Sequence, residues 1–497
     1  MSIGITDEEQ KIIIDILDKY KEYLFYFYGS RVKGTYEKTS DLDILIKGKQ
    51  EMPLNTLEGI KQAFDESKLP YIVNLSDYHS INENFYKKIE KDLFPYDWKE
   101  CKIEEITDIL GDGLHSTPIY TENGEYAFVN GNNLVNGHIE IKTDTKRVSE
   151  SEFIKYKKPL SDRTLLVSIN GTLGNVAEYN NEKIILGKSA CYFNLKNNVS
   201  KSFIKYVLLS KTFQNYLENN ATGTTIKNIS LKQMREYKFL LPPLETQQKI
   251  AKVLSAIDDK IELNNSINNN LEQQAQAIFK SWFIDFEPFC GTMPEDWNLI
   301  KLEDATSQII RGCTTKYVEK SNLINLNQKV NKGTFLDKQY YKYLNENIPI
   351  PKDKYAKKGD ILLNSLGQGT LGRIHYWNED VQNVVVDQHI TIIREKTMIS
   401  TSEFLYLLLS SNKYKEYFEG CITGTTGMLM LNISAVRNTD LYLPDYDIQQ
   451  NFSNIIKPMY KAIEKNIKEN SHLTQLRDTL LPKLMSGEID VDKVIAY

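Results

Sequence analysis

The sequence repeats itself with a period of about 200 residues, and this duplication constrains the fold more than any other feature. The tetrapeptide Gly-Thr-Leu-Gly at 171–174 recurs at 369–372, and Thr-Gly-Thr-Thr at 222–225 recurs at 423–426. An Asp-Trp pair before these motifs, and a Leu-Pro pair with a Gln-Gln pair after them, recur in the same order. So long a period indicates duplicated domains rather than a solenoid of short repeats. Two copies of one unit therefore fill residues 96–497.

Each copy combines β-rich and helical segments. Apolar runs such as 164–169 and 360–363 are typical of short strands and precede the Gly-Thr-Leu-Gly turn. An amphipathic helix is predicted over 202–217 and again over 402–418. A Leu-Pro pair then interrupts the chain, and a long helix begins. This order predicts a mixed α/β (α+β) fold for both copies, each followed by a helical spacer.

The two long helices carry a seam of residues at alternating spacings of four and three. The first seam comprises Ile250, Leu254, Ile257, Ile261, Asn264, Asn268, Leu271, Ala275, Ile278 and Trp282, and the second comprises Phe452, Ile456, Met459, Ile463, Asn466, Asn470, Leu473, Arg477, Leu480 and Leu484. Such spacing over more than four heptads is typical of a coiled coil. We therefore expect the two helices to form a two-helix coiled-coil spacer.

Both seams are interrupted by asparagine at the same two heptad positions. Antiparallel pairing about a common midpoint matches Asn264 with Asn470 and Asn268 with Asn466. A buried asparagine pair sets the register, because any slip leaves an amide against hydrocarbon. The alternative is a local shift of the seam, in which the asparagines are solvated and the neighbouring apolar residues pack instead: Leu263, Ile267 and Ile467.

Composition excludes several classes of protein. No apolar run approaches the ~18 residues that a membrane helix requires, and the five cysteines are scattered without a Cys-x-x-Cys pair. We therefore expect a cytoplasmic protein with no membrane contact, no disulfide framework and no zinc site. The net charge of −5 gives no support to DNA binding, because non-specific nucleic-acid binders are usually basic.

Residues 1–95 stand outside the duplication and carry a different pattern. An aromatic run leads into Gly29 and Ser30, and a helix that starts there offers backbone amides and a hydroxyl to a triphosphate. Asp41 and Asp43 are one residue apart on a predicted strand, so their side chains share one face and can hold metal ions. This spacing resembles the minimal nucleotidyltransferases of bacterial toxin–antitoxin pairs. The resemblance implies a small α/β domain with ATP and Mg²⁺ as ligands.

That family carries a third carboxylate on a following strand, where this chain has Asn74. A neutral amide cannot deprotonate an attacking hydroxyl and ligates Mg²⁺ poorly. Asp77 is offset by three residues, which turns it to the opposite face of a regular strand. Two hypotheses stay open. The module is a nucleotidyltransferase that moves AMP to a protein or nucleic acid, with the rest of the chain as its targeting part, or it is a degenerate fold kept for binding or regulation.

Over residues 96–497 the order of parts resembles the specificity subunits of type I restriction-modification systems. The resemblance rests on Leu-Pro-Pro-Leu-Glu-x-Gln-Gln-x-Ile at 241–250, between the first globular unit and its helix, and on the helix ends at 277–283 and 480–489. It implies five parts, which are 1–95 (nucleotidyltransferase-like), 96–243 (target-recognition domain 1), 244–289 (spacer helix 1), 290–443 (target-recognition domain 2) and 444–497 (spacer helix 2).

The resemblance also implies a function. Each target-recognition domain would bind one half of a bipartite double-stranded DNA site, and the spacer would dock two methyltransferase subunits. Those subunits use S-adenosylmethionine, restriction subunits can join the complex, and the specificity part needs no cofactor of its own. The chain lacks the Asn-Pro-Pro-aromatic motif of a methylase, and Gly187-Lys188-Ser189 lacks the upstream glycine of a phosphate-binding loop.

Phosphate contacts position a protein on DNA, whereas base-edge contacts specify the sequence. The candidates for DNA contact are Lys227 and Asn228, after the first Thr-Gly-Thr-Thr loop, and Arg373, after the second Gly-Thr-Leu-Gly turn. For the loop threonines, local turn hydrogen bonds are the alternative. Because two copies should bind different bases, we expect the base-reading residues in unmatched segments such as 111–137 and 311–345.

Overall fold

The protein is described by a computed structural model that covers residues 4–223, 226–367, 369–424 and 429–495. Two compact units are present, Met1–Asp259 with Thr474–Tyr497 and Lys260–Leu473. The mixed α/β fold class predicted from the sequence is confirmed, whereas the division into five domains stays a prediction. Four threonines of the repeated loops lie outside the described residues: Thr224, Thr225, Thr425 and Thr426.

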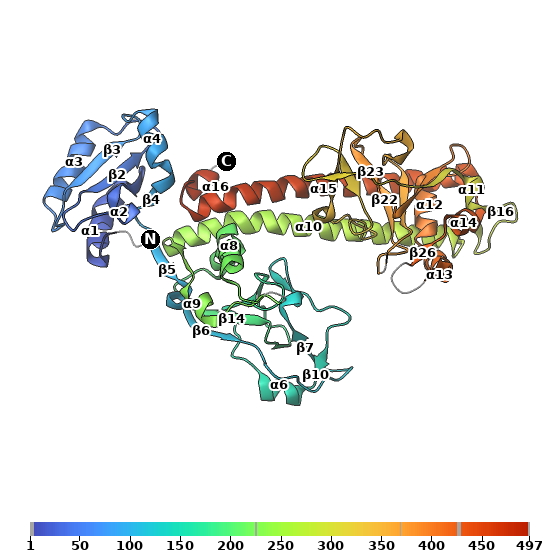
Figure 1. Ribbon diagram of the computed structural model, residues 1–497, viewed down its shortest axis with the longest axis horizontal. Coiled ribbons are helices and arrows are strands. Elements are labelled where there is room, and N and C mark those ends of the chain that lie inside the picture. Colours follow the sequence, from blue (N-terminus) through green and yellow to red (C-terminus); the bar gives the residue numbers. More distant parts are fainter. Residues whose placement is uncertain (1–3, 224–225, 368, 425–428, 496–497) are drawn as a thin grey trace. The chain divides into compact units, whose positions relative to one another are not determined.

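The N-terminal module is built on a four-stranded sheet of order β3-β2-β1-β4 (Figure 1). Its elements are α1 (Asp7–Leu17), β1 (Leu24–Tyr28), α2 (Ser30–Lys33), β2 (Leu42–Lys47), α3 (Leu54–Asp65), β3 (Val73–Asp77), α4 (Glu83–Ile89) and β4 (Phe94–Pro95). Alternate residues of β1 and β2, such as Phe25, Phe27 and Ile44, are buried against the helices. β2 pairs with β3 in parallel, which sets Asp43 beside Asn74.

The first copy of the repeat contains two small sheets and two two-stranded ribbons. Its elements are β5 (Lys99–Lys102), α5 (Ile103–Ile106), β6 (Thr107–Asp112), β7 (Tyr126–Val129), β8 (Leu134–Val135), β9 (His138–Ile139), β10 (Arg147–Val148), α6 (Glu150–Tyr156), β11 (Thr164–Ser168), β12 (Val176–Glu178), β13 (Ile184–Leu186), β14 (Ala190–Leu195), α7 (Lys201–Leu209), α8 (Lys211–Asn220), α9 (Leu231–Glu236) and β15 (Lys238–Leu241). The larger sheet has the order β12-β11-β14-β6, and the smaller sheet, β10-β7-β13, joins β7 and β13 in parallel.

The second copy repeats this construction. Its elements are β16 (Asn298–Lys301), α11 (Leu302–Ala305), β17 (Thr306–Arg311), β18 (Tyr317–Val318), β19 (Ile324–Leu326), β20 (Lys342–Leu344), β21 (Asp360–Asn364), β22 (Ile374–Trp377), β23 (Val384–Val386), β24 (Ile390–Glu395), α12 (Ser402–Leu409), α13 (Asn412–Gly420), β25 (Ile422–Thr423), β26 (Met430–Leu431), α14 (Ile433–Arg437) and β27 (Asp440–Leu443). The sheet β17-β24-β21-β22 corresponds to β6-β14-β11-β12, and β19 pairs in parallel with β23 as β7 does with β13.

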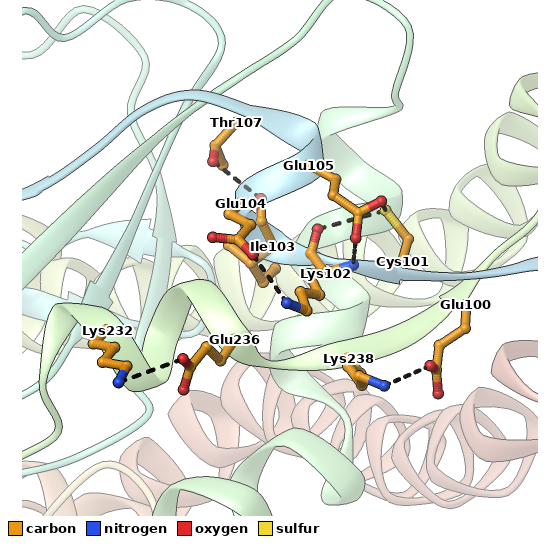
Figure 2. A network of polar contacts seen from close by, with 10 residues as sticks. All are labelled: Glu100, Cys101, Lys102, Ile103, Glu104, Glu105, Thr107, Lys232, Glu236 and Lys238. Atoms are coloured by element: carbon orange, nitrogen blue, oxygen red, sulfur yellow. Dashed lines mark hydrogen bonds and ion pairs between the residues drawn. The ribbon is translucent and has the colours of Figure 1, made fainter. Parts of the chain in front are cut away.

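Each copy begins and ends on one two-stranded ribbon, β5 with β15 and β16 with β27. Figure 2 shows this region of the first copy, where Lys238 Nζ lies 2.8 Å from Glu100 Oε2 across the ribbon. In the second copy Lys301 Nζ lies 2.7 Å from Asp440 Oδ1 across the equivalent ribbon. These pairs are exposed, so we expect them to add little stability. Their recurrence shows that the ribbon is a shared closing element of both copies.

The long helices α10 (Leu244–Phe283) and α15 (Tyr446–Met485) each contain 40 residues. α15 continues through Pro458, and α16 (Val491–Ile495) follows it. Within the second unit, Asn264 pairs with Asn470 and Asn268 with Asn466, so rising numbers on one helix meet falling numbers on the other. The predicted antiparallel coiled coil is confirmed. In the part of the chain that the structure describes, no helix is long and apolar enough to cross a membrane.

Candidate functional site

The N-terminal module gathers its polar residues at one edge of the sheet. Gly29 has φ +83°, and a Cβ there would lie 2.3 Å from Asp43 Oδ2, so glycine allows the turn into α2 to approach the carboxylate closely. Ser30 begins α2 directly after this turn. Gly29 and Asp43, both chosen from the sequence, are therefore close together in the structure.

Asn74 occupies the third position of this centre. Its Nδ2 donates hydrogen bonds to Asp43 Oδ1 (3.0 Å) and to Asp41 Oδ2 (3.3 Å). Burial raises the pKa of the Asp43 carboxyl, the hydrogen bond from Asn74 opposes that rise, and the negative charge of Asp41 adds to it. The amide thus supplies donors where two neighbouring carboxylates would otherwise repel.

Asp77 does not take the place of a third carboxylate at this centre. It is buried, and its oxygens accept from the backbone amides of Met52 (2.8 Å) and His79 (2.7 Å). Among the described residues, no group of three His, Cys, Asp or Glu side chains is placed to hold a metal ion. Two carboxylates and an amide that donates to both fit a pair of Mg²⁺ ions poorly, because the amide nitrogen points where a cation would lie.

The asparagine pairs of the spacer lie where antiparallel pairing places them. Asn264 is 1% exposed, and its Nδ2 donates to Asn470 Oδ1 (2.8 Å) and to Glu469 Oε2 (3.0 Å). Asn466 Nδ2 donates to Asn268 Oδ1 (2.8 Å). That these pairs set the register stays a prediction.

The alternative seam requires three neighbouring apolar residues to pack, and two of them do not, whereas the third, Ile467, is half-buried. Leu263 is 53% exposed and Ile267 is 40% exposed. Within the second unit Asn264 is buried, the other three seam asparagines are half-buried, and the side chains of Leu263 and Ile267 face solvent.

The repeated Gln-Gln pair attaches each globular copy to its spacer helix. Buried Gln247 accepts from the Ser200 amide (2.9 Å) and donates to Pro242 O (2.8 Å). Buried Gln449 does the same with the Thr401 amide (3.1 Å) and Pro444 O (2.8 Å). One glutamine thus joins the start of a helix in the globular copy to the Leu-Pro turn and to the first turn of the long helix.

Three segments of each globular copy come together at one edge. In the first copy, Ile169 donates its amide to Ser189 O (2.9 Å) and accepts from the Ile229 amide (3.0 Å). In the second copy, Ser365 donates to His389 O (2.9 Å) and accepts from the Leu431 amide (2.9 Å). The segments are the turn after β13 or β23, the start of the Gly-Thr-Leu-Gly turn, and the chain that follows the Thr-Gly-Thr-Thr loop.

The sequence candidates for DNA contact lie in these segments. Lys227 is exposed, and its carbonyl accepts from the Gly171 amide (3.0 Å). Asn228 pairs with Thr222 through backbone hydrogen bonds, and its Oδ1 accepts from Asn170 Nδ2 (3.4 Å). That Lys227 and Asn228 contact DNA stays a prediction.

The side chain of Arg373 is less available for DNA contact than that of Lys227. Its guanidinium donates to Gly369 O (3.0 Å) and Asn331 O (3.4 Å), which makes it a support of its own turn. Sequence reasoning did not single out the turn after β13 and β23 as part of this edge. The matched apolar triplets 184–186 and 384–386, each followed by a differing tripeptide, could have indicated it.

Comparison with known proteins agrees with this duplicated architecture. A family model described as the type I restriction modification DNA specificity domain matches residues 95–273 and again residues 294–471. The chain belongs to this family. Among its relatives, the type I restriction enzyme MjaIX specificity subunit of Methanocaldococcus jannaschii is 26% identical over 440 residues, which cover 83% of this chain and 98% of the relative. The crystal structure of a type I S subunit from M. genitalium is 21% identical, covers 78% of this chain and 96% of that chain, and has a TM-score of 0.49.

The N-terminal module belongs to a second family in addition to these specificity domains. A nucleotidyltransferase domain model matches residues 10–104. The probable protein adenylyltransferase MntA of Haemophilus influenzae is 35% identical over 106 residues, which cover 21% of this chain and 93% of that protein. The chain is therefore a type I specificity subunit preceded by a nucleotidyltransferase domain.

Proposed function

We propose that the chain binds a bipartite target in double-stranded DNA, with one half-site on each globular copy. The observation that carries this proposal is the repeated edge where three segments meet on the same hydrogen-bonded frame in both copies. A shared frame with differing side chains suits two domains that bind DNA in the same way and select different bases. The spacer helices α10 and α15 would dock two methyltransferase subunits, which bind S-adenosylmethionine, and restriction subunits would join that complex.

The experiment is to purify the full chain with the methyltransferase subunit of its own system. The complex methylates a pool of DNA duplexes with randomised positions in the presence of S-adenosylmethionine, and the modified adenines are mapped by sequencing. The proposal predicts one split motif with two defined halves and a constant gap. A contiguous motif, or methylation without sequence preference, would contradict it. The methyltransferase subunit without this chain is the control and should give no motif.

A second candidate function, nucleotidyl transfer, is favoured by the Gly29 turn that lies against Asp43. ATP would place its phosphates at the start of α2, and Mg²⁺ would neutralise phosphate charge beside Asp41 and Asp43. Asn74 makes nucleotidyl transfer less favourable, because its amide can neither accept a proton nor ligate Mg²⁺ well. Incubation with labelled ATP and Mg²⁺ tests this, and label transfer that is lost in Asp41→Asn and Asp43→Asn would establish the activity.

A further inference from the structure

The turns after β13 and β23 are held by the same backbone hydrogen bonds. In the first copy the Ala190 amide donates to Gly187 O (3.1 Å), and in the second the Ile390 amide donates to Asp387 O (3.0 Å). The amide at the start of each turn donates to the end of the parallel strand, Gly187 to Val129 O (2.8 Å) and Asp387 to Leu326 O (3.0 Å). The backbone of residues 187–189 is thus supported as that of residues 387–389 is.

The side chains on these two turns differ in chemistry. The tip residue is exposed in both copies and is Lys188 in one and Gln388 in the other. The following residue is Ser189 in the first copy, whose Oγ accepts from the Gly131 amide (2.9 Å) and donates to Asn130 Oδ1 (2.9 Å). A constant backbone with a variable exposed tip is what two DNA-binding domains of different specificity require.

In the second copy a buried carboxylate holds the turn. Asp387 is 1% exposed, accepts from Thr314 Oγ1 (2.6 Å), and is also paired with the ring of His389. These contacts fix the residues on both sides of Gln388, so its flexible side chain projects from a rigid base. Such rigidity is needed for selection between bases that differ by single hydrogen bonds.

Lys188 and Gln388 are the residue types that distinguish base edges in the major groove. Lysine donates to the O6 and N7 acceptors of guanine, and glutamine matches the N6 donor and N7 acceptor of adenine. We infer that Lys188 and Gln388 are equivalent specificity-determining residues, Lys188 for a guanine in one half-site and Gln388 for an adenine in the other. This inference rests on the proposed function, because it presumes that each copy binds one half-site.

The test uses the full chain with its methyltransferase subunit and the randomised duplex pool. Lys188→Gln should change the base that the complex selects at one position of one half-site, so that guanine is no longer preferred there. The other half-site should stay unchanged. Gln388→Lys should change one position in the opposite half. The loss of methylation rate at the original motif should be roughly tenfold to a hundredfold, the range expected for one base-edge contact.

Two controls separate base contact from charge and from folding. Lys183 lies at the other end of β13 and pairs with Glu125 (2.9 Å), so Lys183→Gln removes the same charge and should leave the motif unchanged. Lys188→Arg keeps a donor to guanine and should keep the original base. Thermal unfolding of each variant within about a degree of the parent shows that the exposed substitution leaves the fold intact.

Three outcomes would overturn the inference. Unchanged motifs in Lys188→Gln and Gln388→Lys place the base contacts elsewhere. Uniform weakening over all sequences, with a shallower salt dependence, assigns Lys188 to a phosphate. If the parent complex yields no split motif, the proposed function is contradicted, and the inference that rests on it is contradicted as well.

Discussion

Asn264 donates a 2.8 Å hydrogen bond to Asn470 across the antiparallel helix pair. Replacing only Asn264 by leucine sets hydrocarbon against Asn470 Oδ1, which loses its donor, and this costs about 1–3 kcal/mol. We expect Asn264→Leu with Asn470→Leu together to cost less than Asn264→Leu alone, because two leucines pack at the seam. Thermal unfolding of the four proteins of the double-mutant cycle measures this coupling.

The control for this cycle is Asn269→Leu, which changes an exposed asparagine of α10 to leucine. It should shift the unfolding temperature little. Additive costs for the two seam substitutions would mean that the amides do not stabilise each other, and the register would then depend on the apolar residues of the seam.

Gln449 is fully buried and makes three side-chain hydrogen bonds, one of which is to Ile399 O (3.0 Å). Gln449→Leu leaves three backbone groups without these partners, so we expect a destabilisation on the order of 3 kcal/mol. Gln247→Leu should be milder, because Gln247 makes two such bonds. Chemical unfolding should show the order Gln449→Leu, Gln247→Leu, parent. The exposed neighbour Gln248 is the control, and a loss for Gln248→Leu as large as for Gln247→Leu would contradict the anchoring role.

The sequence predicted the features that depend on regular spacing. The duplication predicted two equal globular copies, and the 4-3 seam predicted that Asn264 meets Asn470 and that Asn268 meets Asn466, because helical periodicity places side chains on known faces. Strand periodicity likewise predicted that the Asp77 side chain points away from Asp41 and Asp43. In the structure this side chain accepts hydrogen bonds from two backbone amides.

Features that depend on single capping contacts or on tertiary pairing were not predicted. The prediction of one amphipathic helix over 202–217 is wrong. Ser210 ends α7, and its side chain accepts a hydrogen bond from the Phe213 amide, which begins α8. The helix over 402–418 is likewise two helices, since α12 ends at Leu409. The parallel pairing of β13 with β7 brings together segments nearly 60 residues apart, and no local pattern encodes such a partner.

The hydrogen bonds from Asn74 to Asp41 and Asp43 lead to a prediction about metal binding. Asn74→Asp replaces two donors by a third carboxylate, which further raises the pKa of Asp43 and creates an oxygen-only site suited to Mg²⁺ or Mn²⁺. We expect millimolar Mn²⁺ to raise the unfolding temperature of Asn74→Asp by several degrees and to leave the parent nearly unchanged.

The matched control is Asn74→Ala, which removes the amide without adding a carboxylate and should gain no Mn²⁺ response. An equal stabilisation of the parent by Mn²⁺ would show that its two carboxylates already hold the ion. In that case nucleotidyl transfer by the N-terminal module becomes the stronger hypothesis.

Asp97 gives a prediction for pH. Burial raises the pKa of its carboxyl from 3.8 to about 6, its own backbone amide opposes the rise, and the charges of Asp18 and Asp490 add to it. The folded state therefore holds this proton more tightly than the unfolded chain. The stability that Asp97 contributes is complete below pH 4 and is lost as the pH rises through 6, by roughly 3 kcal/mol.

Asp97→Asn removes this ionisation and keeps the shape of the protonated acid. The variant and the parent should unfold at similar temperatures at pH 4, and the variant should be the more stable above pH 6.5. The equivalent residue of the second copy, Asp296, is exposed, so Asp296→Asn should differ from the parent by the same small amount at every pH. Because other titrating groups affect parent and variants alike, the difference between them isolates Asp97. A difference that does not grow between pH 4 and pH 7 would mean that water reaches this carboxylate in the folded state.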